Sequence, residues 1–180
     1  LITMMLTAAA LFVLSLLGNL PLFIGMCILS WWTLSCKCLA KEGKGVAQAL
    51  RDSLEHGRKQ VGRIVGRDTS CLSEDEIIKA TVETIAENTT DGVTAPMLYL
   101  LLGGPVLAMG FKAASTLDSM VGYLNEKYRD IGWSSAKFDD LLNWIPARMT
   151  GILMCISAFL CKLDGRNAFR IMKRDHGNHL

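Results

Sequence analysis

Charge is distributed very unevenly along this chain of 180 residues. The first charged side chain is Lys37, so residues 1–36 form an uninterrupted uncharged segment. About 20 apolar residues are enough to span a membrane, so this segment is too long for a single span unless it is strongly tilted. The wider composition, 51% hydrophobic and 20% charged, excludes a disordered tail, a secreted disulfide scaffold and a coiled coil. The net charge of +2 also excludes a strongly basic nucleic-acid binder, and no nucleic acid is expected as a partner.

Glycine and proline interrupt the first two apolar runs. The sequence Gly18-Asn19-Leu20-Pro21 favours two short helices joined as a hairpin over residues 1–36, and one long kinked helix is the alternative. In the second run, residues 92–111, Gly103-Gly104-Pro105 predicts a re-entrant or strongly kinked membrane segment.

The third apolar run, residues 141–161, contains Arg148. The part after Arg148 is short for a membrane span, so its guanidinium must reach the interface or face a polar interior. A core helix of a soluble domain is the alternative for this last run.

Two basic segments flank the apolar runs. Residues 37–67 hold eight basic and three acidic side chains, and residues 162–175 hold five and two. The positive-inside rule places such segments on the cytoplasmic face. The sequence therefore predicts an all-α, polytopic integral membrane protein of the cell membrane, with cytoplasmic motif-bearing loops and one broken apolar segment.

The chain divides into four predicted segments: a membrane hairpin (1–36), a basic amphipathic cytoplasmic segment (37–72), a motif-bearing core with the broken segment (73–148), and a short apolar helix with a basic tail (149–180). In the second segment, the spacing of Val46, Leu50 and Leu54 predicts one amphipathic helix over residues 41–63. That helix would lie near the membrane surface, and an ordinary solvated surface helix is the alternative.

Cysteine and histidine do not indicate a metal centre. No pair of the six cysteines has C-x-x-C spacing, and the three histidines are scattered through polar segments. A zinc or iron–sulfur site needs clustered ligands, so buried, reduced thiols are the preferred interpretation.

An acidic helix is predicted after residue 72. Ser73-x-x-Glu76 has the pattern of a capping box. Helical spacing predicts an apolar face of Ile78, Val82 and Ile85, with Glu76, Glu83 and Glu87 opposite. The helix is expected to end near Asn88, with Asp91-Gly92 as a turn. The carboxylate face is either solvated or a site for magnesium or a cationic ligand.

Residues 115–148 form the densest polar stretch. Its carboxylates suit magnesium, and its arginines and lysines suit phosphate. Its tyrosine and tryptophan side chains either anchor the chain at a membrane interface or stack on a large planar ligand. These are Tyr123, Tyr128, Trp133 and Trp144.

Five longer motifs occur in order between residues 64 and 148. They are I-V-G-R-D-T-S (64–70), A-T-V-E-T-I-A-E-N-T-T-D-G-V-T-A-P (80–96), T-L-D-S-M-V-G-Y (116–123), N-E-K-Y-R-D-I-G-W (125–133) and D-D-L-L-N-W-I-P-A-R (139–148). Together they resemble the CobD/CbiB family of cobalamin-biosynthesis membrane proteins, the adenosylcobinamide-phosphate synthases. The family usually has Asn where this chain has Ser115, and it continues into a Ser-Pro-Asn motif. The resemblance therefore implies a copy truncated at both ends.

The resemblance implies an ATP-dependent, amide-forming ligase. Its substrates would be adenosylcobyric acid and aminopropanol or its phosphate, and the product adenosylcobinamide or its phosphate. Other membrane enzymes of the cobalamin pathway and membrane lipid are the further partners it suggests. A corrinoid-handling membrane transporter and a non-catalytic membrane subunit are the alternatives.

Such a reaction needs magnesium ligands, phosphate-binding cations and a base. Within the motifs, we expect the catalytic residues to be Glu83, Glu87, Asn88 and Asp91. We expect substrate and phosphate to be bound by Arg67, Asp68, Thr69, Lys127, Arg129 and Arg148. We expect magnesium to be held by Asp118, Glu126, Asp139 and Asp140. For Arg148, the alternative is a structural ion pair with Asp139 or Asp140.

Overall fold

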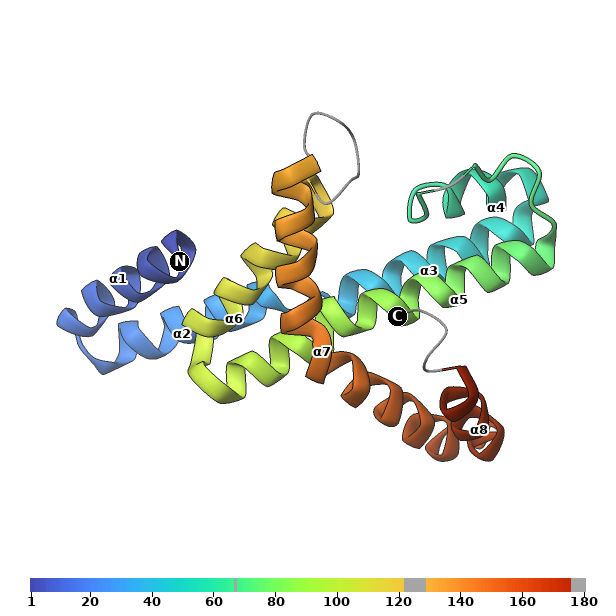
Figure 1. The fold of residues 1–180 in the computed structure, drawn as a ribbon. Helices are drawn as coiled ribbons and strands as arrows, with labels where there is room; N and C mark the ends of the chain where they lie inside the picture. The colour runs from blue at the N-terminus through green and yellow to red at the C-terminus, as the bar shows by residue number, and fades with distance from the viewer. Residues whose placement is uncertain (67, 122–128, 176–180) are drawn as a thin grey trace. The chain divides into compact units, whose positions relative to one another are not determined.

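The structure is a computed structural model that describes residues 1–66, 68–121 and 129–175, and every regular element within these ranges is helical (Figure 1). The helices are α1 (Ile2–Leu16), α2 (Asn19–Thr33), α3 (Cys36–Asp52), α4 (Leu54–Val61), α5 (Glu74–Thr89), the π-helical turn η1 (Thr90–Thr94), α6 (Ala95–Val121), α7 (Arg129–Leu160) and α8 (Gly165–Asp175). Three helical stretches are long and apolar enough to cross a membrane: Asn19–Asp52, Glu74–Val121 and Gly132–Leu160. The predicted all-α, polytopic fold class is therefore confirmed.

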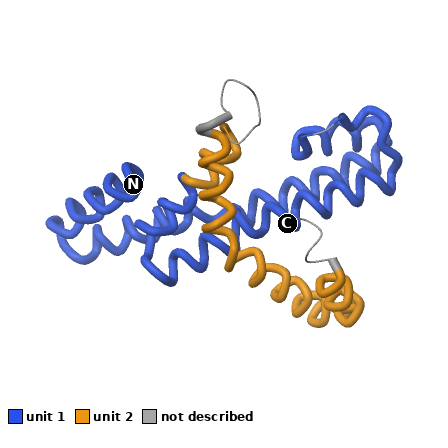
Figure 2. Tube along the Cα trace, in the orientation of Figure 1, with its two compact units in different colours: residues 1–113 blue, residues 114–180 orange. Residues whose placement is uncertain are grey.

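The chain forms two compact units, residues 1–113 and 114–180 (Figure 2). The first unit begins with two apolar helices, α1 and α2, which fold back on each other around Gly18. Gly18 has φ +118°, a conformation that glycine adopts without steric cost. Gly25 lets the two helices approach, because a Cβ there would lie 2.3 Å from Leu14 Cδ1. Of the two arrangements considered for residues 1–36, the structure therefore has the hairpin.

The other helices α3, α4 and α5 are more polar than α1 and α2, and they pack around a small core in the first unit. The core consists of Val46, Val61, Ile77 and Ala80, each at most 2% exposed. Small residues allow close packing: a Cβ on Gly43 of α3 would lie 2.5 Å from Ile85 Cδ1 of α5.

The prediction of a single helix over residues 41–63 is wrong. The helix stops at Ser53, whose backbone is extended and whose Oγ accepts a hydrogen bond from the His56 amide at 3.1 Å. This N-cap starts α4 as a separate helix. Helix α4 then folds against α3, where Gly57 packs on Leu50. The turn lets the apolar sides of α3 and α4 pack against each other, whereas one straight helix would keep them apart.

The start of α5 is as predicted, but its buried face is not. The Ser73 amide donates to Glu76 Oε2 at 2.8 Å, which completes a capping box. The buried side chains are Ile77, Ala80 and Thr81, whereas Ile78 is 47% exposed and Val82 is 63% exposed. The packing partners α3 and α4 cover the face centred on Ile77, and that choice cannot be read from spacing alone.

The expected turn at Asp91-Gly92 is absent from the structure. The chain instead passes through the π-helical turn η1 directly into α6. A π-turn leaves one carbonyl outside the regular helical ladder. Here the Gly92 carbonyl accepts a hydrogen bond from the Ser35 amide, at the start of α3, at 2.7 Å. Because η1 supplies the irregularity without breaking the helix, no turn is needed.

The predicted break in the second apolar run is present. Gly103 and Gly104 have non-helical backbone angles, and Gly104 has φ +62°. The chain reverses sharply there (Figure 1), and the rings of Tyr99 and Phe111 stack with their centroids 4.9 Å apart. Twelve residues along a straight helix would separate those rings by about 18 Å. The segment is therefore a helical hairpin that folds back on itself.

The second unit contains the end of α6, together with α7 and α8. Helix α7 continues through position 148, so the predicted segment boundary at 148/149 does not coincide with a helix end. It contains the buried Pro146, and Figure 1 shows α7 bending part-way along its length, as helices do at proline. Helix α8 packs on α7 through Met172, whose Sδ would lie 3.0 Å from a Cβ on Gly151. Arg148 is therefore an internal residue of α7, which continues to Leu160.

Candidate functional site

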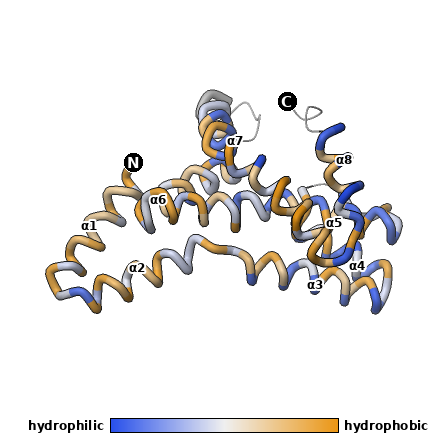
Figure 3. The backbone as a smooth tube through the Cα atoms, turned by 90° about the horizontal axis from the view of Figure 1, so that it is seen from below, coloured by the Kyte–Doolittle hydropathy of each residue, from blue (hydrophilic) through white to orange (hydrophobic). Residues whose placement is uncertain are grey.

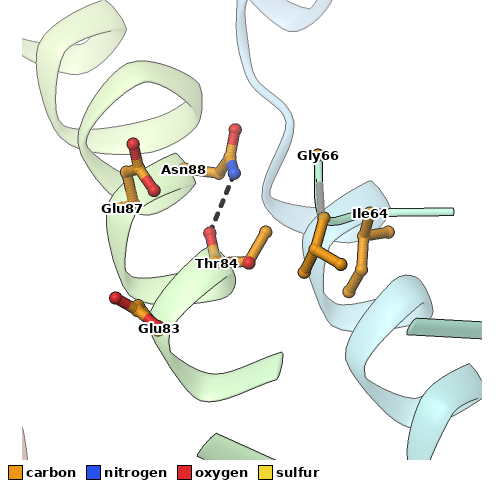
Figure 4. Close-up of a pocket in the computed structure, with 7 residues that line it drawn as sticks. Ile64, Gly66, Glu83, Thr84, Glu87 and Asn88 are labelled. Carbon is orange, nitrogen blue, oxygen red and sulfur yellow. Dashed lines mark hydrogen bonds between the residues drawn. The ribbon is translucent and has the colours of Figure 1, made fainter. Parts of the chain in front are cut away.

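Two of the five sequence motifs meet at one cavity in the first unit. The cavity has a volume of about 280 Å³ and lies between the end of α4 and the second half of α5 (Figure 4). It is lined by Ile64, Val65, Gly66, Glu83, Thr84, Glu87 and Asn88. Residues 64–66 open the motif 64–70, and the other four belong to the motif 80–96. The structure thus brings together segments about 20 residues apart in the sequence.

Helix α5 presents the polar wall of this cavity. Glu83 and Glu87 are one turn apart and lie on the same side of the helix, with Thr84 facing Ile64 (Figure 4). Asn88 Nδ2 donates to the Thr84 carbonyl at 2.8 Å, which fixes the amide and leaves its oxygen as an acceptor. Two carboxylates and an amide oxygen are suited to attract an ammonium group or a hard cation.

The opposite wall is a loop that α4 holds in place. Arg58 Nε donates to the Leu72 carbonyl at 2.7 Å, and Thr69 Oγ1 donates to the Arg58 carbonyl at 3.0 Å. The second half of the loop is therefore anchored to one residue of α4. The hydroxyl of Thr69, which we expected to bind substrate, is engaged in this anchoring.

The carboxylate of Asp68 stabilises its own turn. Its two oxygens accept hydrogen bonds from the Ser70 amide at 2.9 Å and the Ser70 hydroxyl at 3.0 Å. These bonds favour the ionised form and hold the pKa of Asp68 below its ordinary value. The structure thus gives both Asp68 and Thr69 a local structural contact, and substrate binding by them stays a prediction.

Asp91 lies apart from the other three predicted catalytic residues. It belongs to η1, is partly buried, and is not among the residues that line the cavity. Glu83, Glu87 and Asn88 are therefore brought together with residues 64–66, and Asp91 stands one turn further along the chain.

The predicted magnesium residues that the structure describes all lie in the second unit. Asp118 is close enough to Asp140 for their like charges to interact. Asp140 pairs with Lys137 at 3.4 Å, and Asp139 Oδ2 accepts from Asn143 Nδ2 at 2.9 Å. In the described ranges, no group of three or more His, Cys, Asp or Glu side chains is arranged to hold a metal ion. The predicted ligand set is thus only partly described, with two of its members near each other.

The alternative ion pair of Arg148 with Asp139 or Asp140 is wrong. Eight or nine residues of continuous α7 separate the charges by about 12–14 Å. The guanidinium instead lies over the Trp144 ring at 4.1 Å, and Nη1 donates to the Trp144 carbonyl at 2.6 Å. Within the described chain Arg148 has no carboxylate at ion-pair distance, and its side chain is exposed.

Several predicted site residues lie outside the described residues. These are Arg67, Glu126 and Lys127, together with the side chain of Arg129. Conversely, the sequence analysis did not single out the cavity-lining Ile64, Val65, Gly66 and Thr84, or the loop anchor Arg58. The first four lie within the motifs, which was the available signal, whereas nothing in the sequence indicated Arg58.

Comparison with known proteins identifies the chain's relatives. The family model described as CobD/Cbib protein matches residues 1–180. The chain belongs to the CobD/CbiB family. A "Cobalamin biosynthesis protein CobD" of Listeria monocytogenes serotype 4b is 55% identical over 152 residues, covering 84% of this chain and 48% of the relative. Proteins of the same name from Geobacter metallireducens and Clostridium tetani are 54% and 48% identical over 153 residues, again covering 84% of this chain and 48% of each relative.

The chain therefore spans about half the length of the curated CobD relatives that it matches. No solved structure matches it. Family membership agrees with the motif-based resemblance and covers all five motifs, including both segments that line the cavity.

Proposed function

We propose that this CobD/CbiB chain carries part of the active site of an enzyme of cobalamin biosynthesis. The reaction is the ATP-dependent formation of an amide between adenosylcobyric acid and aminopropanol or its phosphate. The single observation that carries the proposal is the cavity at which motifs 64–70 and 80–96 meet, with Glu83, Glu87 and Asn88 on one wall.

The chemistry explains why a carboxylate-rich cavity is useful. A carboxylate does not condense with an amine unaided, because oxide is a very poor leaving group. Phosphoryl transfer from ATP, with magnesium, makes the carboxyl group reactive as an acyl phosphate. The amine must also lose a proton before it attacks, and we assign to Glu83 and Glu87 the role of attracting the ammonium and accepting that proton. We assign the phosphate-binding role to the basic side chains of the motifs, Arg148 among them.

The test is an assay of the full-length protein in membranes. Product amide and ADP should form only when corrinoid acid, amine and ATP are all present. Glu87→Gln keeps the shape of the side chain and removes its charge, and it should lower kcat/KM by about 100-fold or more. The matched control is Glu74→Gln, on the same helix but outside the cavity, which should leave kcat/KM within about twofold. Equal activity of both variants would contradict the proposed role of the cavity.

We propose that the cavity faces the cytoplasm, where ATP is available. The basic composition of residues 37–67 supports this orientation. A cysteine introduced at Asp75, in a background without the native cysteines, should react with a membrane-impermeant maleimide only after the cytoplasmic face is opened. Labelling from the outside of intact cells would contradict the orientation.

A corrinoid transporter is the second candidate, and the broken helix at Gly103-Gly104 is the observation that favours it. Interrupted helices at membrane depth commonly line substrate paths in transporters. Uptake of labelled corrinoid by vesicles, without amide formation, would favour this function over the ligase.

A further inference from the structure

Helix α3 carries a stripe of four basic side chains and one glutamine, opposite the face that packs on α5 and η1. The stripe consists of Lys37, Lys41, Lys44, Gln48 and Arg51, which follow one another at steps of three and four residues and fall within about 80° of arc. The opposite face holds the packing contacts: Leu39 near Gly92, Gly43 against Ile85, and the buried Val46. The packing of α3 therefore fixes the direction in which the stripe points.

The cations of the stripe are not neutralised by the protein. All four basic side chains are exposed, and within the described residues none of them lies at ion-pair distance from a carboxylate. Three of them, Lys37, Lys41 and Lys44, line a cavity of about 580 Å³ together with Arg63 from the loop after α4. Glu42 is the one acidic side chain in that lining. The cavity is thus strongly positive and suited to an anion.

Two tryptophans stand directly beside this cavity. Trp31 and Trp32 end the apolar helix α2 and are 70% and 64% exposed. They line a neighbouring cavity of about 370 Å³ that shares Lys37 and Lys41 with the basic one. Exposed tryptophan at the end of an apolar helix is typical of the membrane–water interface, where the ring sits at headgroup level.

We propose that Trp31, Trp32, Lys37, Lys41, Lys44 and Arg63 form a binding site for the phosphate headgroup of an anionic phospholipid. The tryptophans lie at the level of the glycerol and upper acyl chains, and the lysines and Arg63 contact the phosphate. Charge complementarity, together with the continuity of the site with the apolar helix α2, distinguishes a membrane lipid from a soluble anion. The site shares no residue with the lining of the cavity that contains Glu83 and Glu87.

The experiment uses the full-length protein reconstituted with phosphatidylcholine alone or mixed with phosphatidylglycerol. Lipid retained after re-purification is quantified by mass spectrometry. We expect retained phosphatidylglycerol to exceed its share of the mixture, and to fall as salt is raised. Each lysine near an anionic membrane surface contributes roughly fivefold in affinity, so removing three should reduce it on the order of a hundredfold.

Two triple variants isolate the stripe from general charge effects. The test variant replaces the three lysines of the stripe by glutamine: K37Q, K41Q and K44Q. The matched control removes three exposed lysines elsewhere: K59Q, K79Q and K162Q. A third variant keeps the charge with arginine: K37R, K41R and K44R. Only the first should lose phosphatidylglycerol retention, and circular dichroism should show unchanged helix content in all three.

Defined outcomes overturn the proposal. Equal phosphatidylglycerol retention by the test and control variants would show that the stripe does not bind lipid. Displacement of the lipid by millimolar inorganic phosphate or ATP, together with weaker ATP binding by the test variant, would assign the site to a soluble phosphate ligand. If Trp31→Phe with Trp32→Phe, which keeps two aromatic rings, retains as much lipid as wild type, the indole-specific part of the proposal is wrong. The lysine part is then judged by the triple variants.

Discussion

The hairpin α1–α2 and the layer α3–α5 both consist of α-helices, but the layer buries its large apolar side chains and the hairpin exposes them. In the layer, the polar helices turn Val46, Val61 and Ile77 inwards and expose charged side chains. In the hairpin, whose residues are mostly hydrophobic (Figure 3), large apolar side chains are exposed instead: Phe12 and Phe23 are each 64% exposed. A core excludes water in the first case, whereas lipid takes that role in the second. The comparison shows that burial within the protein does not measure how apolar an environment is.

The largest effect should come from the core of the layer. Ile77→Ala removes a fully buried side chain and should lower the free energy of unfolding by about 2–5 kcal/mol. The neighbouring Ile78→Ala, at a position 47% exposed, should cost well under half as much. Thermal unfolding of the detergent-solubilised full-length protein measures both. If the two variants lost equal stability, the α5 face identified here would be wrong.

A charge placed in the hairpin should act on membrane insertion rather than on packing. Phe23→Lys puts a cation in the second turn of α2 and should disfavour insertion by up to about 2.5–3.5 kcal/mol, the cost of a lysine at a helix centre. The same charge added by Ala47→Lys on the exposed side of α3 should leave insertion unchanged. The membrane-integrated fraction after alkaline extraction is the measurement. Normal integration of the Phe23 variant would remove α2 from the list of membrane helices.

Loss of the N-terminal cap of α5 should have a smaller energetic effect. Ser73→Ala removes the hydroxyl that bonds Glu76 at 2.8 Å and should cost about 1 kcal/mol. Ser70→Ala, in the preceding loop, is the control for losing a hydroxyl outside a helix cap. Hydrogen exchange in the first turn of α5 should accelerate in the first variant and not in the second.

The smallest effect should follow from pH at Asp68. Because the pKa of its carboxyl is lower in the folded protein, its contribution to stability is present above the ordinary aspartate value and is lost as pH falls through the folded pKa. The Ser70 amide should therefore lose exchange protection in strong acid, after correction for intrinsic rates. In Asp68→Asn that protection should no longer change with pH; an unaltered pH dependence would mean that another group controls the turn.

Sequence reasoning succeeded where one short segment decides its own conformation. The capping box at Ser73 and the glycine break at Gly103-Gly104 are local, and the structure has both. It failed where a partner helix decides: Ile78 and Val82 have the spacing of a buried face, yet the packing of α3 and α4 favours the face of Ile77.

The candidate site was predictable in part. Glu83, Glu87 and Asn88 stand on one helix, so their spacing alone could suggest a common wall. Gly66 lies on the opposite wall, in a loop whose second half is held by the two hydrogen bonds of Arg58. Such long-range contacts leave no periodic trace in a single sequence.

The hydrogen bond from Ser35 to Gly92 has a consequence for the order of assembly. The amide of Ser35, the N-cap of α3, donates to the Gly92 carbonyl of η1. During synthesis Ser35 cannot reach this hydrogen-bonding state until Gly92 has emerged, more than 50 residues later. The junctions α2–α3 and α5–α6 therefore mature as one cooperative step, and a lesion in either should delay both.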